Sequence, residues 1–505
     1  MPQFNIEELQ NPRAYSHAVT SVRLIQTHIS WVCLAGEFAY KIKKPVDFGF
    51  LDFSTLAKRK ALCAAEFDLN RRFAPDLYTG VVPIVRVNDE LRVGGEGEAI
   101  EWAVQMRRFP QESQLDECLT RGALTAADLA AFAVQLAAIH QRLPCVPPAG
   151  FGSAAAAWRP MAENFLQIGT TILHGRAVET VETVGNIEAW SARQHQALCA
   201  ALDNRRADGF VRECHGDLHL TNLVSMDGEI LAFDCIEFSA GLRWVDVISD
   251  AAFLVMDLEC RSRPDLAAAF IDAYLAASGD YQGAALLGFY KVYRSMVRAK
   301  VAALQHDGGS GEPDVLRTRF DRHVAYAASI MTGQATTIYL TCGVSGSGKS
   351  WLSEQLVPLL AAIRIRSDVE RKRKLSGVVA DYSSDAITDV YDHLLAAAAS
   401  VVRGGTSVIV DATFIDAQQR KRFVDLAQTL GGPLRIIYTH APRNVLESRI
   451  RARALRGSDP SDADLQVLEH QLATIDEPQG AEVVYVDTDA VIDVGAVARA
   501  LRQAT

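Results

Sequence analysis

The spacing of hydrophobic positions changes along the first two thirds of the chain. β-Branched and aromatic residues alternate with polar ones over residues 29–42 and 80–106, which predicts strands with one buried face. From about residue 123 to 330, apolar residues recur every three or four positions, as in the alanine-rich stretch from Ala126 to His140. That spacing predicts helices. A strand-rich segment followed by a helical one indicates an α+β arrangement.

The last third of the chain alternates between two patterns. Short apolar runs that fit buried strands occur at 337–342, 363–367, 407–411, 434–439 and 482–486, and helical patterns separate them. Regular alternation of this kind predicts a parallel sheet with helices on both faces, which is an α/β fold.

A change of pattern near residue 333 marks the boundary between these two parts. The segment His306-Asp-Gly-Gly-Ser-Gly-Glu-Pro-Asp314 has the composition of a flexible loop, and a helical pattern follows it. The first buried strand of the last third begins just after Gly333. We therefore predict two domains, residues 1–333 and 334–505, with the 306–314 loop inside the first.

Composition and charge narrow the class of protein. The 505 residues are 49% hydrophobic and 22% charged, which is typical of globular domains. A net charge of −10 disfavours a nucleic-acid partner. Nine cysteines without a C-x-x-C pair argue against a disulfide framework and a zinc site. No apolar run approaches the roughly 18 residues of a membrane span, and no signal peptide is evident. We expect a cytoplasmic protein without membrane contact, and its oligomeric state stays open.

The first chemical motif directly follows the predicted strand 337–342. Gly343-Val-Ser-Gly-Ser-Gly-Lys-Ser350 fits G-x-x-x-x-G-K-[ST], and a helical pattern begins at Trp351. Backbone N–H groups of such a loop surround phosphates, the lysine reaches the β- and γ-phosphates, and the final hydroxyl holds Mg²⁺. The predicted phosphate-binding residues are Gly343, Ser345, Gly346, Ser347, Gly348, Lys349 and Ser350, and Ser350 is also the predicted metal ligand.

Charged residues follow the next two predicted strands. Asp368 could act as a general base towards an acceptor hydroxyl, and Arg371, three residues later, could hold the acceptor or the transferring phosphate. An N-capping aspartate beside a solvated arginine is the alternative. Asp411 ends another strand, where it could support Mg²⁺, contact the acceptor or serve the structure alone.

Arg449 and Arg453 lie four residues apart in a helical pattern, ahead of the polar segment 457–463. They could form a lid over the phosphates, or a solvated basic face. With the phosphate loop, the Ser-Asp-x-x-Arg sequence and the Val-Asp-Ala-Thr strand, this pair makes residues 336–505 resemble P-loop kinases of small molecules or nucleic-acid ends. Gluconate kinase, polynucleotide kinase and zeta toxins are examples of that group.

A second set of chemical residues lies in the first domain. His215-Gly-Asp-Leu-His-Leu-Thr-Asn222 has the spacing of the catalytic loop H-x-D-x-x-x-x-N, and Asp234 ends a predicted strand twelve residues later. Such a loop presents a carboxylate to the acceptor hydroxyl and an amide oxygen to a metal ion. We predict that Asp217 is the catalytic base and that Asn222 and Asp234 bind Mg²⁺.

Lys41 lies in an alternating strand and is the predicted partner of the nucleotide phosphates. Lys43, two residues further on, points the same way and is the alternative. Glu66, in a helical stretch, is the predicted ion-pair partner of the lysine, or otherwise a solvated helix carboxylate.

These motifs, with the Trp-Val-Asp-Val sequence at 244–247, make residues 1–330 resemble the aminoglycoside phosphotransferase family, a branch of the protein-kinase-like fold. One feature differs: Gly36 is the only glycine before residue 48, so no Gly-rich hairpin precedes the lysines, and both ATP and GTP stay open as donors. Together with the run Tyr40–Asp52, the two resemblances match a bacterial family of fused proteins. The implied fold is an α+β kinase-like domain followed by an α/β P-loop kinase domain.

We therefore predict a bifunctional kinase that uses ATP, or GTP, with Mg²⁺ to phosphorylate hydroxyls of a small molecule such as a sugar or sugar acid. A regulatory role for one domain, antibiotic resistance and a toxin-like kinase are the alternatives. Lys291, Arg294 and Arg298 lie on one stripe of a helical pattern, which predicts a solvated face or a site for an anionic acceptor. No short motif encodes the acceptor.

Overall fold

The computed structural model describes residues 4–47, 51–169, 178–309, 311–333, 335–374, 384–456 and 463–503. Residues 48–50 of the Tyr40–Asp52 run and residues 457–462 of the predicted lid segment lie outside the described residues. The chain forms two compact units. Unit 1 comprises Met1–Leu124, Ile139–Pro160 and Cys199–Asp250, and unit 2 comprises Thr125–Ala138, Met161–Leu198 and Ala251–Thr505. The division of the sequence at residue 333 stays a prediction.

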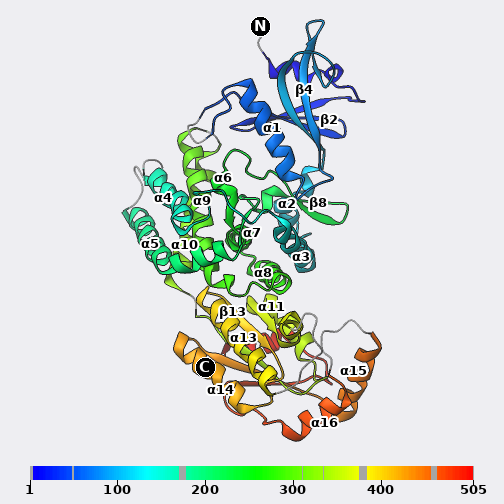
Figure 1. The fold of residues 1–505 in the computed structure, drawn as a ribbon, viewed down its shortest axis with the longest axis vertical. Helices are drawn as coiled ribbons and strands as arrows, with labels where there is room; N and C mark the ends of the chain where they lie inside the picture. Colours follow the sequence, from blue (N-terminus) through cyan, green and yellow to red (C-terminus); the bar gives the residue numbers. More distant parts are fainter. Residues whose placement is uncertain are drawn as a thin grey trace. The chain divides into compact units, whose positions relative to one another are not determined.

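Unit 1 is built on a six-stranded antiparallel sheet of order β1-β2-β3-β6-β4-β5. The strands are β1 (Val22–Gln26), β2 (Ser30–Ala35), β3 (Phe38–Lys43), β4 (Tyr78–Val87), β5 (Glu90–Val93) and β6 (Ala99–Arg107). Helix α1 (Leu56–Asn70) lies against this sheet (Figure 1) and begins at Thr55, whose side chain accepts the Lys58 N–H. Two short 3₁₀ helices, η1 (Ile6–Gln10) and η2 (Pro12–Ala14), precede the sheet.

The alternation along β3 sends its residues to two different cores. Tyr40 and Ile42 pack with the residues of η1, while Ala39 packs against Cys63 of α1. Lys41 and Lys43 share the face of Ala39, because side chains two apart in a strand point the same way. Both lysines are therefore directed at α1.

The rest of unit 1 surrounds the catalytic-loop sequence. Strand β7 (Val211–Glu213) pairs with β10 (Trp244–Asp246), and β8 (Leu223–Met226) pairs with β9 (Glu229–Ala232). The connecting elements are η3 (Gln111–Ser113), α2 (Leu115–Thr120), η4 (Leu220–Asn222) and α6 (Ala240–Arg243).

Helices dominate the first part of unit 2, as predicted. They are α8 (Pro264–Ser278), η5 (Gly283–Leu286), α9 (Leu287–Asp307) and α10 (Pro313–Thr332), together with parts of α3 (Ala126–Arg142), α4 (Ala154–Gly169), α5 (Val178–Ala207) and α7 (Val247–Cys260). Across the described part of the chain, no helix is both long and apolar enough to cross a membrane.

The basic stripe predicted on α9 is not a solvated face. Lys291 is buried, and its Nζ lies 3.0 Å from a carboxylate oxygen of Glu259. Arg294 is buried with its guanidinium over the rings of Phe253 and Tyr293. The aliphatic stems and charges of Lys291 and Arg294 therefore pack against α7, which contradicts the solvated-face alternative, and the anionic-acceptor alternative stays a prediction.

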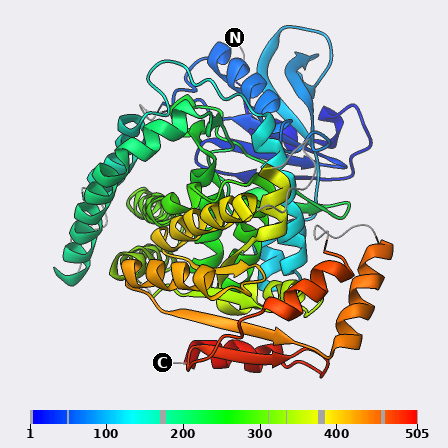
Figure 2. The same ribbon diagram turned by 60° about the horizontal axis from the view of Figure 1, so that its bottom comes forward.

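The second part of unit 2 is a five-stranded parallel sheet of order β12-β13-β11-β14-β15. All five predicted strands are confirmed, as β11 (Ile338–Cys342), β12 (Ala362–Arg366), β13 (Ser407–Asp411), β14 (Leu434–His440) and β15 (Val483–Asp487). Helices α11 (Lys349–Leu360) and α17 (Val494–Gln503) cover one face, and α13 (Ser384–Arg403) and α14 (Ala417–Leu430) cover the other (Figures 1 and 2). Helix α12 (Ser367–Lys374) follows β12, and α15 (Arg443–Arg456) and α16 (Leu465–Thr474) follow β14.

Candidate active sites

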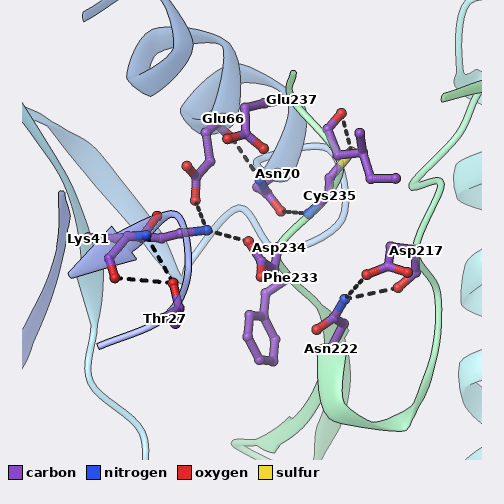
Figure 3. Close-up of polar contacts among 12 residues, drawn as sticks. Thr27, Lys41, Glu66, Asn70, Asp217, Asn222, Phe233, Asp234, Cys235 and Glu237 are labelled. Atoms are coloured by element: carbon purple, nitrogen blue, oxygen red, sulfur yellow. Dashed lines mark hydrogen bonds and ion pairs between the residues drawn. The ribbon is translucent and has the colours of Figure 1, made fainter. Parts of the chain in front are cut away.

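A buried glutamate joins the two lysines of β3 in unit 1. Lys41 Nζ lies 2.8 Å from Glu66 Oε1, and Lys43 Nζ lies 2.7 Å from Glu66 Oε2. Figure 3 shows Glu66 reaching down from α1 to Lys41. Burial alone would raise the pKa of Glu66, but the two ammonium groups outweigh it and lower that pKa to about 2. Glu66 is therefore a charged, paired residue and not a solvated helix carboxylate.

The two lysines differ in their remaining partners. Lys41 also contacts Asp234, whose side chain is 44% exposed, whereas Lys43 contacts the buried Glu237 and has no exposed surface. Burial would lower the pKa of Lys41, but Asp234 and then Glu66 outweigh it and raise that pKa well above its usual value. Because Lys43 is enclosed between carboxylates, the geometry favours Lys41 as the lysine that can reach a ligand.

Glu237 is a residue that the sequence motifs did not identify. It follows Asp234 by three positions and belongs to the same cluster of charges, through its contact with Lys43. Figure 3 shows Glu237 near Glu66. The only hint in the sequence was that Glu237 is a carboxylate three residues after the predicted metal ligand Asp234. Nothing in the sequence paired it with a lysine almost 200 residues earlier.

The backbone of Asp234 is held in a conformation that is rare for a non-glycine residue, with φ of 64°. Its N–H donates to the Tyr78 hydroxyl at 3.1 Å, and the next N–H, of Cys235, donates to Asn70 Oδ1 at 2.8 Å. The Asn70 amide in turn donates to the carbonyl of Glu66 at 2.8 Å. Strand β4 and helix α1 thus fix the turn that directs the Asp234 carboxylate at Lys41 (Figure 3).

The predicted base and the predicted metal ligand of the catalytic loop lie together. Asn222 Nδ2 donates to both Asp217 Oδ2 and Asp217 O at 3.0 Å (Figure 3), and His219 Nε2 lies 3.3 Å from Asp217 Oδ2. The Asn222 carbonyl accepts the N–H of Phe233 at 3.0 Å, so this loop also borders the Asp234 turn. Unit 1 therefore brings together all five residues that the sequence assigned to this site.

The His215 side chain holds the catalytic loop through contacts of both its ring nitrogens. Its Nδ1 accepts the Asp217 N–H at 3.3 Å, and its Nε2 lies 2.9 Å from the carbonyl of Phe233. Burial lowers the pKa of His215, which favours the neutral ring. A neutral ring with the proton on Nε2 satisfies both contacts, because it donates to the carbonyl and accepts from the amide.

The oxygen donors of this site fit a magnesium ion. Asn222 turns its NH₂ group to Asp217, which leaves the amide oxygen on the other side, and the Asp234 carboxylate is partly exposed. Carboxylate and amide oxygens are the hard ligands that Mg²⁺ prefers.

In unit 2, two glycines let the phosphate loop pass close to its neighbours. A Cβ on Gly343 would lie 2.4 Å from the carbonyl of Thr439, and one on Gly346 would lie 2.9 Å from the carbonyl of Leu446. Both residues have positive φ. Helix α11 starts directly after Gly348, which has no side chain to cap the first N–H groups. Uncapped N–H groups at a helix start, behind a glycine loop, fit a phosphate group.

The loop opens into a cavity of about 860 Å³. Residues predicted to bind phosphates or acceptor contribute much of its wall, namely Ser345, Gly346, Gly348, Lys349, Ser350, Asp368, Arg371, Arg449 and Arg453. Ser347 is instead buried, with its hydroxyl 2.8 Å from that of Thr439. The cavity therefore unites the predicted donor side and the predicted acceptor side of the second site.

Two charged groups flank the phosphate position. Lys349 Nζ donates to the carbonyl of Val344 at 2.8 Å, and burial lowers its pKa against the attraction of Asp411 and Asp368. Asp368 also lines the cavity, with its Oδ1 3.9 Å from Arg371 Nη2. Asp411 is buried and held by the Ser353 hydroxyl at 3.1 Å, so it combines a structural contact with a place in the cavity wall.

Arg449 and Arg453 are attached to the site by backbone contacts. Arg449 donates to the carbonyl of Gly346 at 3.2 Å and to that of Thr488 at 2.7 Å, and Arg453 donates to the carbonyl of Ala463 at 2.6 Å. The sequence did not indicate Gln471 of α16, whose Oε1 accepts the Ser345 N–H at 2.7 Å.

Comparison with known proteins matches each of the two parts of the chain to a family model. The model described as the phosphotransferase enzyme family matches residues 50–287, and the model described as the AAA domain matches residues 338–478. Uncharacterised protein Rv2004c of Mycobacterium tuberculosis and uncharacterised protein Mb2027c of Mycobacterium bovis are each 32% identical to this chain over 461 residues, which is 88% of this chain and 89% of theirs.

Solved structures similar to parts of the chain include two kinases. A gluconokinase from Sinorhizobium meliloti is 24% identical and covers 34% of this chain and 92% of its own, with a TM-score of 0.26. A choline kinase from Cryptosporidium parvum is 10% identical and covers 64% of this chain and 94% of its own, with a TM-score of 0.39. The chain joins a kinase-like phosphotransferase domain of the aminoglycoside phosphotransferase type to a C-terminal P-loop kinase-like domain. Because the match to the mycobacterial proteins extends over most of both chains at 32% identity, the chain belongs to their family.

Proposed function

We propose that this protein is a bifunctional kinase that transfers the γ-phosphoryl group of ATP to hydroxyls of a small molecule at two separate sites. The observation that carries the proposal is the repetition of one chemical set in two unrelated folds. Each unit places a lysine, an acceptor-side aspartate and oxygen donors suited to a metal ion in one location. Phosphoryl transfer needs these components, because catalysis of that reaction consists largely of positioning and charge neutralisation.

At the first site, Lys41 binds the nucleotide phosphates and Glu66 keeps the lysine in place. Asp234 and the Asn222 amide oxygen would hold the metal ion. Asp217 orients the acceptor hydroxyl and takes its proton, and the Asn222 NH₂ group fixes the rotamer of that carboxylate. Mg²⁺, when bound, supplies neutralisation of phosphate charge.

At the second site, backbone N–H groups of the phosphate loop and Lys349 bind the nucleotide phosphates. The Ser350 hydroxyl is the metal ligand, and Asp368 faces the acceptor. Arg371 lies beside Asp368 and holds the acceptor or the transferring group, since a guanidinium matches phosphate and carboxylate oxygens. Arg449 and Arg453 complete the wall around the phosphates.

The acceptor that fits the second site best is a small polyol or sugar acid. The cavity volume lies in the range of small-molecule binding sites, which favours a small acceptor over a polymer. Asp368 and Asp416 offer acceptors for hydroxyl groups, and the arginines offer partners for an anionic group. GTP is the alternative donor.

The test is an ATP-consumption screen of sugars, sugar acids and polyols with the full-length protein. Each acceptor that gives turnover is then repeated with Asp217→Asn and with Asp368→Asn. The proposal expects every phosphorylated product to depend on one of the two aspartates. Turnover that survives in the double variant would contradict the proposal. A second domain that binds nucleotide, forms no product of its own and only changes the rate of the first domain would also contradict it.

A further inference from the structure

Strand β12 is an edge strand of the parallel sheet, and the α8–η5 region covers part of that edge. The Arg364 N–H donates to Asp272 of α8 at 2.5 Å, and the Arg364 carbonyl accepts from the Tyr281 hydroxyl at 3.3 Å. Edge strands carry backbone groups without a strand partner. Here both backbone groups of one residue are satisfied by side chains from the helical part of unit 2.

The side chain of the same residue turns inward to the phosphate loop. Arg364 Nη1 donates to the carbonyl of Ser350 at 3.0 Å and lies 3.4 Å from the Ser353 hydroxyl. That hydroxyl is 3.1 Å from both Ser350 O and Asp411 Oδ2. A continuous series of contacts therefore runs from Asp272 through Arg364 to the residue that carries the predicted metal-binding hydroxyl.

We propose that Arg364 is a positioning residue of the second site, and that Asp272 and Tyr281 hold it in place, so that the metal-binding geometry of Ser350 depends on helix α8. This inference rests on the proposed function of that site. The guanidinium fixes the first turn of α11 at the Ser350 carbonyl, and the hydroxyl direction of Ser350 follows from that backbone. If the contacts of Arg364 served only to cover the edge of the sheet, its backbone contacts to Asp272 and Tyr281 would be enough. The guanidinium would then have no reason to contact the Ser350 carbonyl.

The experiment measures binding of a fluorescent ADP analogue to the full-length protein, with Mg²⁺ and with EDTA, in a Lys41→Ala background that weakens the first site. Arg364→Met should reduce the gain in affinity that Mg²⁺ provides by about tenfold, the equivalent of one charge-assisted hydrogen bond. Affinity without metal should stay within about twofold, because the loop N–H groups and Lys349 are untouched. Ser350→Ala should show the same selective loss.

Three variants separate positioning from general stability. Asp272→Asn keeps an oxygen for the Arg364 N–H and should keep the wild-type magnesium gain in ADP affinity, whereas Asp272→Leu removes that acceptor and should share the loss. Arg435→Met, at an arginine of β14 that donates to the Leu434 carbonyl, is the matched control and should change nothing.

The outcomes distinguish this inference from the proposed function. If Lys349→Ala leaves binding unchanged in the Lys41→Ala background, the proposed second nucleotide site is wrong. If Lys349→Ala abolishes binding but Arg364→Met keeps the full magnesium gain, only the positioning role is wrong. Equal losses with and without Mg²⁺ in Arg364→Met, or an Asp272→Asn variant as weak as Asp272→Leu, would also overturn it.

Discussion

The two candidate sites hold their lysines in different ways. Lys41 of unit 1 lies between two carboxylates, Glu66 and Asp234, whereas Lys349 of unit 2 donates to a backbone carbonyl. A nucleotide must compete with a carboxylate at the first lysine, but only with a neutral group at the second. Electrostatic attraction between charged groups is the stronger competitor. We therefore expect metal and nucleotide binding to be more tightly coupled at the first site, because Asp234 is both a partner of the lysine and a proposed metal ligand.

The largest expected effect tests whether the two sites act independently. Asp217→Asn should reduce the first-site reaction by about 10² to 10⁴ in rate and leave the second unchanged, and Asp368→Asn should do the reverse. Each change removes a proton acceptor and keeps the side-chain shape. Rates for each acceptor found in the ATP-consumption screen measure the effect.

Nucleotide affinity is the control for these variants, because neither aspartate is expected to contact the donor. Affinity within about twofold of wild type would show that only the chemical step changed. A fall of both reactions in either single variant would refute independent sites.

The next effect concerns stability and separates the two lysine environments. Lys43 is fully buried between Glu66 and Glu237, so Lys43→Met leaves two buried carboxylates short of a partner and should cost about 3 to 5 kcal/mol of unfolding free energy. Lys349→Met should cost much less, because its contact is a carbonyl and burial already disfavours its charge. Urea unfolding of the full chain measures both.

An exposed ion pair provides the reference for that comparison. Lys421 pairs with Asp425 on the surface of α14, and Lys421→Met should change stability by about 0 to 1 kcal/mol. Adding Glu237→Leu to Lys43→Met should recover part of the loss, since one uncompensated charge is removed. Equal costs for Lys43→Met and Lys349→Met would mean that the carboxylates around Lys43 do not stabilise unit 1.

The coupling of metal and nucleotide gives an intermediate effect. Asp234→Ala should abolish the gain in first-site affinity that Mg²⁺ provides, about ten- to a hundredfold, and should raise the affinity for metal-free nucleotide because Lys41 loses its competitor. Ser350→Ala at the second site should lose the gain without that rise. Calorimetry with ADP, with and without Mg²⁺, distinguishes the two. A metal-free affinity that falls in Asp234→Ala would show that this carboxylate does not compete for the lysine.

The same contrast explains how far the sequence could predict each site. The candidate second site depends on one contiguous motif, whose backbone N–H groups are the proposed phosphate donors, so the eight residues from Gly343 to Ser350 were enough to predict it. All five strands of its sheet were also predicted, because parallel strands buried on both faces form continuous apolar runs. What the motif could not predict is the support from elsewhere, such as Gln471 on the Ser345 N–H.

The first site depends on side chains that meet only in the folded chain. Spacing identified Asp217, Asn222 and Asp234, and strand alternation identified the lysines. The pairing of Lys43 with Glu237 spans almost 200 residues, and no local pattern encodes such a contact. For the same reason the solvated face, one of the two alternatives for the stripe containing Lys291, was wrong: helical periodicity shows which residues share a face, but not which neighbouring helix covers that face.

The smallest expected effect contrasts two carboxylates with opposite pKa shifts. Lysines lower the pKa of Glu66 to about 2, so its stabilising contribution is present above the unfolded pKa near 4.5 and is lost as pH falls towards 2. Burial raises the pKa of Asp272 to about 6, against an ordinary value of 3.8. The native state then binds more protons than the unfolded state between those values. The contribution of Asp272 therefore weakens as pH rises from about 4 to 6 and stays low above that range.

Asp272→Asn should remove this dependence while keeping the hydrogen bond to the Arg364 N–H. The variant should gain about 1 to 2 kcal/mol over wild type at neutral pH, a figure below the full pKa difference because Asp272 is only half-buried. The gain should shrink as pH falls from about 6 to 4 and approach zero below that range, where the wild-type carboxyl group is protonated in both states. Unfolding midpoints measured across that range test the sign, and Asp425→Asn, at an exposed carboxylate, controls for the change in net charge. If Asp272→Asn is instead less stable than wild type at neutral pH, and this deficit shrinks as pH falls, then Arg364 stabilises the carboxyl group in its charged form, and the contact between α8 and β12 resembles the ion pairs of the first site.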